Sequence, residues 1–139
     1  MGCYLNEKEH SHVTSFGYEL IRDHVLASIL GKHEKDILYW AGKDLARKFP
    51  LYSMEEAISF FQEAGWGTLE LDKTTKDSAY YTLHTYNLPQ SGISRSHRLE
   101  AGFLAEQQQK IAGYLTECYD EQLKKNGIVT FHIKWDLKS

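Results

Sequence analysis

The side chains best suited to chemistry are histidines and cysteines, and they lack the spacing that a site needs. His10 and His12 could ligate a metal, but no third ligand accompanies them, and a closed metal site needs more. Cys3 and Cys118 have no metal-type spacing and are too few for a disulfide framework. No Cys, Ser or Lys has a local base arrangement that would activate a nucleophile. We therefore predict no catalytic residue, no metal site and no cofactor.

Aromatic side chains come from every predicted element and suggest apolar binding instead. We expect most of them in the core, because aromatic rings supply much of the buried area of a small domain. The alternative is a pocket between helices and sheet for a small apolar ligand, with Glu117 and Glu121 as its polar handles. These acids could instead lie at the sheet margin and reach water, since unpaired buried carboxylates are costly. The ligand-binding candidates are Trp40, Trp66, Tyr81, Phe103, Glu117, Tyr119, Glu121 and Trp135.

Two glycines inside predicted helices indicate close backbone contacts. Gly42 and Gly102 each cost about 1 kcal/mol relative to Ala, so a close approach should compensate for them. One hypothesis is a surface that receives a helix of another molecule. Packing within the chain explains the same glycines at least as well. The interface candidates are Tyr39, Trp40, Gly42 and Lys43.

Helical periodicity predicts four helices. The first runs from about 16 to 30, begins after Thr14 or Ser15 and stops at Gly31. The second covers 34–48, the third follows a capping box at residues 53–56, and the fourth covers 98–112. The main apolar stripes of the first three are Leu20, Ile21, Val25 and Ile29; Ile37, Leu38, Ala41, Leu45 and Phe49; and Ala57, Ile58, Phe61 and Ala64.

Alternation of apolar and polar residues predicts four strands, at 68–72, 78–86, 115–124 and 128–137. A loop at 87–97 separates the two strand pairs. The order is α-α-α-β-β-α-β-β, so we predict the α+β class, with one four-stranded antiparallel sheet and helices packed on it.

The last hairpin has a predicted register. A three-residue loop at 125–127, with Gly127 left-handed, would place Leu123 opposite Val129, Tyr119 opposite Ile133 and Leu115 opposite Leu137. Burial should select this register, because a slip of one residue exchanges the two faces of a strand. The same register puts Glu117 and Glu121 on the apolar face and pairs His132 with Asp120.

Length, charge and hydropathy limit the number of domains and the classes of binding partner that we expect. The 139 residues suit one domain, which we place at 14–139 after a loose polar arm at 1–13. The formal charge of −3 gives no electrostatic basis for binding nucleic acid or an anionic membrane. No apolar run is long enough to cross a membrane, and no signal-peptide core is present. We therefore expect a cytoplasmic protein.

Three segments together resemble the small YslB-type proteins of Gram-positive bacteria. They are 37–50, 60–67 and 99–107, and the closing stretch 129–138 fits as well. More distantly, the glycine-containing helix followed by a hairpin is similar to 4-vinyl-reductase domains, Bet3-type subunits of the TRAPP tethering complex and haem-based nitric-oxide sensors. The resemblance implies their shared fold and binding of ligands or partners.

The chain departs from these distant families at their functional residues. Cys118 is present, but residues 129–132 contain no second cysteine of the pair that usually closes vinyl-reductase domains. The Tyr-x-Ser-x-Arg motif of the haem sensors is missing, so haem is not expected.

These observations favour a non-enzymatic adaptor or interaction module that forms a homodimer through its helices. Large apolar residues beyond the main stripes support a dimer, since excess exposed apolar area usually marks an interaction surface. A sensor that binds a small apolar ligand is the alternative, and an enzyme of unknown class is third. The residues beyond the stripes are Tyr18, Leu26, Tyr39 and Trp40.

Overall fold

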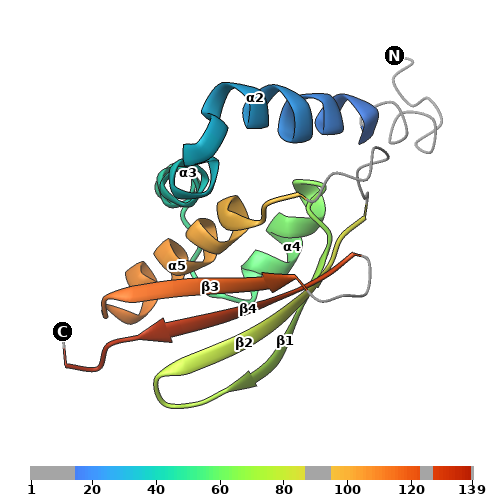
Figure 1. The fold of residues 1–139 in the computed structure, drawn as a ribbon. Helices are drawn as coiled ribbons and strands as arrows, with labels where there is room; N and C mark the ends of the chain where they lie inside the picture. The colour runs from blue at the N-terminus through green and yellow to red at the C-terminus, as the bar shows by residue number, and fades with distance from the viewer. Residues whose placement is uncertain (1–14, 87–94, 123–126, 139) are drawn as a thin grey trace.

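The computed structural model describes residues 15–86, 95–122 and 127–138 (Figure 1). Its helical elements are η1 (Leu20–Val25, a π-helix), α2 (Leu26–Leu30), η2 (Gly31–His33, a 3₁₀ turn), α3 (Glu34–Lys48), α4 (Glu56–Glu63) and α5 (Arg98–Ala112). Its strands are β1 (Thr68–Thr74), β2 (Ser78–His84), β3 (Thr116–Gln122) and β4 (Ile128–Trp135). The predicted order and the α+β class are confirmed. The predicted arm at 1–13 lies outside the described residues.

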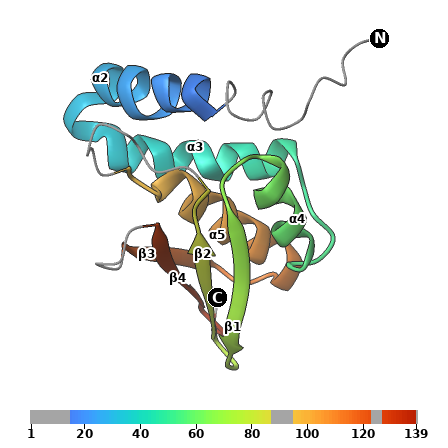
Figure 2. The ribbon, with the colours of Figure 1, turned by 90° about the vertical axis from the view of Figure 1, so that its right-hand side faces the viewer.

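The molecule is built in three layers. The strands form one antiparallel sheet in the order β1-β2-β4-β3. Helices α3, α4 and α5 lie on one side of this sheet, and its other side carries no helix of the described part of the chain (Figures 1 and 2). Residues 15–30, which we call the N-terminal helix, form a third layer beyond α3 (Figure 2). The outer side of the N-terminal helix and the helix-free side of the sheet are therefore on opposite sides of the molecule (Figure 2).

The core lies between the sheet and the helices. Strand β4 alternates as predicted, and its inward residues Val129, Phe131 and Ile133 are buried. Helix α4 contributes Ala57 and Phe61, which confirms its predicted inner stripe. Burying such apolar side chains removes their surface from water, which is the main favourable contribution to folding.

The two helix glycines bring α3 and α5 into direct backbone contact. A Cβ at Gly42 would overlap the carbonyl oxygen of Leu99 and lie 2.8 Å from the amide nitrogen of Phe103. A Cβ at Gly102 would overlap the carbonyl oxygen of Tyr39. Gly42 therefore serves packing within the chain, which was the alternative to an intermolecular surface.

This close contact also determines which side of α3 is buried. Leu38, Gly42 and Ala46 are buried, whereas Ile37 and Phe49, both assigned to the predicted stripe, are exposed. The prediction for Ile37 and Phe49 was wrong because α3 meets α5 along its smallest residues rather than along its most apolar line. Small residues allow the two backbones to approach closely.

The predicted register of the last hairpin was also wrong. Gly127 does have a positive φ, of 81°, but Cys118 rather than Tyr119 pairs with Ile133. His132 pairs with Tyr119 rather than with Asp120. Leu123, whose partner was predicted as Val129, lies outside the described residues.

The observed register places small and polar residues on the inner face of β3. Thr116, Cys118 and Asp120 pair with the inward residues of β4. Arg98 of α5 compensates for this polarity, since its Nη1 lies 2.7 Å from Oδ1 of Asp120 and donates to the carbonyl oxygen of Cys118. A buried polar group is tolerated when it has such a partner.

Candidate functional site

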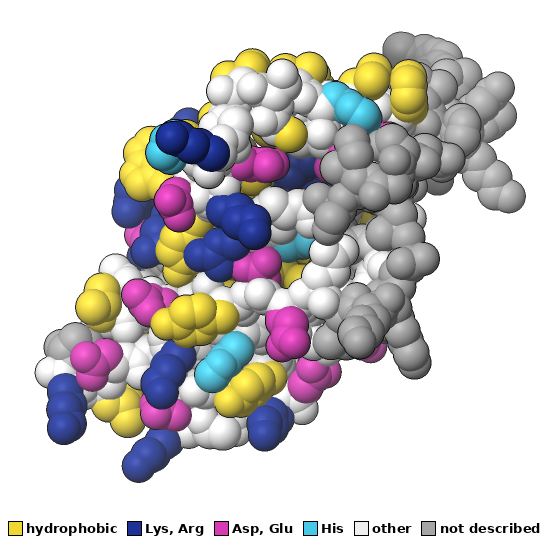
Figure 3. Space-filling view, viewed as in Figure 1, with side chains coloured by type: hydrophobic (Ala, Val, Ile, Leu, Met, Phe, Trp, Pro, Cys, Tyr) yellow, Lys and Arg dark blue, Asp and Glu magenta, His cyan; other side chains and the backbone are white. Residues whose placement is uncertain are grey.

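The N-terminal helix exposes its predicted apolar stripe, Leu20, Ile21, Val25 and Ile29, together with Phe16. The exposed fractions are 61% for Phe16, 42% for Leu20, 56% for Ile21, 43% for Val25 and 72% for Ile29. Hydrophobic side chains accordingly lie along the top of the molecule, over this helix (Figure 3). We call these five residues the apolar face. A helix normally turns such a stripe toward the core, so this orientation is inverted.

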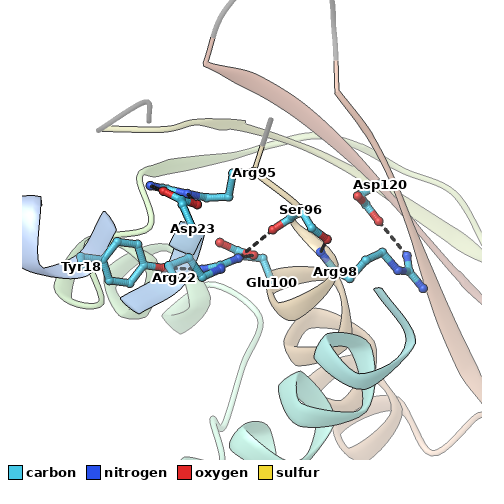
Figure 4. Close-up of polar contacts among 8 residues, drawn as sticks. All are labelled: Tyr18, Arg22, Asp23, Arg95, Ser96, Arg98, Glu100 and Asp120. Atoms are coloured by element: carbon cyan, nitrogen blue, oxygen red, sulfur yellow. Dashed lines mark hydrogen bonds and ion pairs between the residues drawn. The ribbon is translucent and has the colours of Figure 1, made fainter. Parts of the chain in front are cut away.

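The buried side of the same helix is charged. Glu19, Arg22 and Asp23 are all buried, and Arg22 and Asp23 point away from the solvent toward the segment that begins α5 (Figure 4). Nη2 of Arg22 lies 2.6 Å from Oε1 of Glu100 and donates to the carbonyl oxygen of Ser96 at 2.9 Å. These contacts join positions that are more than 70 residues apart.

A second ion pair lies beside the first. Arg95 donates through Nε and Nη2 to the two carboxylate oxygens of Asp23, at 2.8 and 2.7 Å. This two-pronged geometry is the strong form of a guanidinium–carboxylate contact. The ring of Tyr18 lies near both guanidinium groups, 5.8 Å from Arg22 and 5.2 Å from Arg95, and Arg22 also donates to the Tyr18 hydroxyl. We call Arg22, Asp23, Arg95 and Glu100 the charge cluster.

Both members of the central pair are held in their ionised forms. Burial alone would raise the pKa of the Glu100 carboxyl, but the positive charge of Arg22 overcomes it and the pKa is lowered. Burial likewise opposes the charge of Arg22, yet Glu100 raises the pKa of the guanidinium above its ordinary value. The N-terminal helix is thus fastened to the domain by buried ion pairs, and Tyr18 of the same helix packs against the core.

His97, the residue before α5, is buried next to the charge cluster. Its Nε2 has no hydrogen-bond partner in the described part of the chain. Burial lowers the pKa of this imidazole; Glu100 and Asp120 raise it in part, and Arg22 and Arg95 lower it further. His97 is therefore neutral at pH 7, and protonation would place a new charge beside two guanidinium groups.

The core holds four of the predicted ligand-binding residues. Trp66 and Phe103 pack against one another with ring centres 5.6 Å apart. Phe60 stacks on Phe103 at 4.4 Å, so these rings fill one another's space. Tyr81 and Trp135 are also buried in the core, and Trp135 donates through Nε1 to the carbonyl oxygen of Lys76 at 2.9 Å.

Three other predicted ligand-binding residues lie together on the side of the sheet that faces away from the helices. Glu117, Tyr119 and Glu121 point outward, because Thr116, Cys118 and Asp120 take the inward positions of β3. The Tyr119 hydroxyl donates to Oε2 of Glu117 at 2.6 Å. The hypothesis that the two acids are polar handles of a pocket between helices and sheet was therefore wrong. Their alternative placement, in contact with water, is the correct one.

The interface candidates divide between two environments. Trp40 is 61% exposed on the surface of α3. Tyr39 instead points toward β3, where its hydroxyl accepts a hydrogen bond from the amide of Cys118 at 3.0 Å. The guanidinium of Arg98 and the ammonium of Lys43 both lie near the Tyr39 ring, at 4.2 and 4.8 Å from its centre. Of the four, Trp40 is the one left open to a partner.

The charge cluster was missed by the sequence analysis, although one signal was available. Arg22 and Asp23 follow Glu19 by three and four residues, the spacing of residues that share one side of a helix. Their partners Arg95 and Glu100 are distant in sequence, so no local pattern identifies them. Among the described residues, no group of three possible ligands could hold a metal ion. In the same part of the chain, no helix is long and apolar enough to cross a membrane.

The fold belongs to the α+β class and is similar to that of a vinyl-4-reductase family protein. The crystal structure of a vinyl-4-reductase family protein from Methanocaldococcus jannaschii matches with a TM-score of 0.59 at 21% identity, over 71% of this chain and 68% of that one. At this identity the likeness concerns the fold alone.

Comparison of the sequence with known proteins then identifies the family of the chain. The model of the family described as "Protein of unknown function (DUF2507)" matches residues 15–134, so the chain belongs to that family. It is 41% identical over 129 residues to "Uncharacterized protein YslB" of Bacillus subtilis (strain 168), over 91% of this chain and 87% of that relative. The resemblance to YslB-type proteins is confirmed.

Proposed function

We propose that this chain is a non-enzymatic interaction module that forms a two-fold homodimer through the apolar face of its N-terminal helix. One observation carries the proposal: five large apolar side chains of one helix face water while its charged side chains are buried. Exposed apolar stripes on a folded domain are unfavourable unless another surface covers them. Covering this stripe would release its water and stabilise the complex.

The helix is held firmly enough to present a surface. Two buried ion pairs fix it to the segment that begins α5, at heavy-atom distances of 2.6 to 2.8 Å. A partner would therefore meet a preformed helix and would not have to order it, which reduces the entropic cost of binding. Gly17 is also exposed, and a Cβ there would meet no atom within 4 Å, so another helix could approach closely at this end.

A second copy of the chain is the occupant that this surface fits best. A two-fold axis across the middle of the helix would set its apolar face against an identical one, the commonest arrangement among oligomers. A membrane surface suits the face less well, because the net charge of −3 opposes anionic lipids.

The size of the face sets the expected affinity. Sixteen helical residues span about 24 Å, so one helix pair buries less than a standard interface of about 800 Å² per partner. We therefore expect a dissociation constant in the micromolar range, tightened if Trp40 and Ile37 of α3 also reach the partner.

Native mass spectrometry of the purified chain tests the proposal against its rivals. The expected spectrum contains monomer and dimer, with a dimer fraction that grows with concentration and no retained small molecule. A monomer that carries a small molecule would support the ligand-binding alternative and contradict the proposal. A monomer without one, at all concentrations, would also contradict it.

A further inference from the structure

The outer face of the sheet carries a row of aromatic and basic side chains that crosses all four strands. Lys73 of β1 pairs with Tyr80 of β2, Tyr80 pairs with His132 of β4, and His132 pairs with Tyr119 of β3. Tyr80 and His132 are stacked, with ring centres 4.4 Å apart at an angle of 14°. The face is not covered by a helix of the described chain (Figures 1 and 2).

The two ends of this row differ. At the β1 end, the ammonium nitrogen of Lys73 lies 4.8 Å from the centre of the Tyr80 ring, a cation–π contact made within the chain. At the β3 end, the ring of Tyr119 is half-exposed, and no cation of the described residues lies over it. Tyr119 stands between two outward carboxylates of the same strand, Glu117 and Glu121.

Two surface grooves meet at Tyr119, and their charges differ. The first, of about 680 Å³, is lined by Glu117 and two other acids but also by three lysines, so its charges are balanced. The second, of about 610 Å³, is lined by Asp72, Asp120 and Glu121 and by no lysine or arginine of the described residues. Asp120 is already paired with Arg98, whereas Asp72 and Glu121 have no ion pair among the described residues.

The shape of the second groove follows from the strand register. Thr82, Thr130 and Glu121 form the outward row next to the aromatic row. Asp72 lies over this row, since its carboxylate accepts a hydrogen bond from the Thr82 hydroxyl. Neighbouring strands are about 4.8 Å apart, so Thr82, which holds the Asp72 carboxylate, is about 10 Å from Glu121 across a floor of small residues. Tyr119 and His132 form the aromatic wall.

We propose that this groove receives a lysine or arginine side chain from a basic segment of a partner protein. An aromatic ring beside uncompensated carboxylates attracts an ammonium or guanidinium group by cation–π and ionic contacts together. Charge complementarity identifies the partner as basic, because no lysine or arginine of the described chain lines the groove. This surface is on the opposite side of the molecule from the apolar face, so a homodimer would leave it free.

A titration of the full-length ¹⁵N-labelled chain with a labelled (Arg-Gly)₅ peptide tests the proposal. The peptide should shift the amide signals of residues 119–121 and 130–132, and (Glu-Gly)₅ should leave them unchanged. Tyr119→Leu removes the ring and Glu121→Gln removes one charge, and each should weaken binding about threefold. Glu63→Gln is the matched control, because it removes another exposed charge at the end of α4, outside the groove.

Binding that Glu63→Gln weakens as much as Glu121→Gln would show attraction by net charge alone and would overturn the proposal. Amide shifts concentrated away from the second groove would overturn it as well. The titration is independent of self-association, since an Ile21→Glu variant, altered on the opposite side, should bind the peptide with unchanged affinity.

Discussion

Replacing Glu100 by Gln should destabilise the protein far more than its single lost charge would on the surface. The variant keeps the size of the side chain but leaves the guanidinium of Arg22 without its counter-charge. Arg22 and Glu100 have side-chain exposures of 3% and 2%, so water cannot replace the missing carboxylate. Removing one member of a buried ion pair costs about 3–5 kcal/mol. That cost is a large part of the total stability of a domain, which is about 5–15 kcal/mol.

The same helix provides the matched control. Glu106 of α5 pairs with Arg47 at 3.2 Å, but the Arg47 side chain is 52% exposed. Glu106→Gln should therefore cost no more than about 1 kcal/mol. Urea unfolding followed by circular dichroism at pH 7 measures both variants. A second variant, Arg22→Met with Glu100→Met, should recover much of the loss, because it removes the unpaired charge.

An equal loss of stability in Glu100→Gln and Glu106→Gln would refute the reasoning. It would mean that the N-terminal helix is not held by the charge cluster. Hydrogen exchange locates the effect: Glu100→Gln should accelerate exchange of amides in residues 18–26 more than in β4.

Three further predictions concern other parts of the fold. The pKa of His97 is lowered in the folded state, so its contribution to stability is present above about pH 6.5 and is lost as the pH falls through the folded pKa, by up to about 1.4 kcal/mol per pH unit. Urea midpoints between pH 7 and 5 should show this slope, and His97→Gln should flatten it. Gly42→Ala should cost several kcal/mol or prevent folding, because the new methyl overlaps the Leu99 carbonyl; a thermal midpoint within a degree of wild type would contradict the α3–α5 contact. Gly127→Val should cost about 1–2 kcal/mol, since its φ of 81° penalises a branched side chain, and an unchanged urea midpoint would argue against that turn.

Sequence periodicity predicted the helices and strands well, because it depends on local structure alone. The π-helical and α-helical parts of the N-terminal helix fall inside the predicted range 16–30. The direction in which that helix faces was predicted wrongly. Burial of its charged stripe depends on Arg95 and Glu100, and contacts over such a separation leave no local pattern.

The predicted register of β3 was wrong for a related reason. We assumed that the inner face must be the more apolar one, which favoured Tyr119 over Asp120. Arg98 reaches Asp120 from α5 and makes the polar face the buried one. The acids Glu117 and Glu121, which were out of place on an inner face, lie in water on the outer face instead.

Sedimentation velocity of matched variants tests the dimer proposal most directly. Wild type at about 100 µM, well above a micromolar dissociation constant, should sediment mainly as a dimer. Ile21→Glu should sediment as a monomer with an unchanged circular dichroism spectrum, because a charge in the interface would lose its water without gaining a partner. Leu71→Glu, at a similarly exposed apolar residue on β1, should remain dimeric. A monomeric wild type, or a dimer that survives Ile21→Glu, would contradict the account.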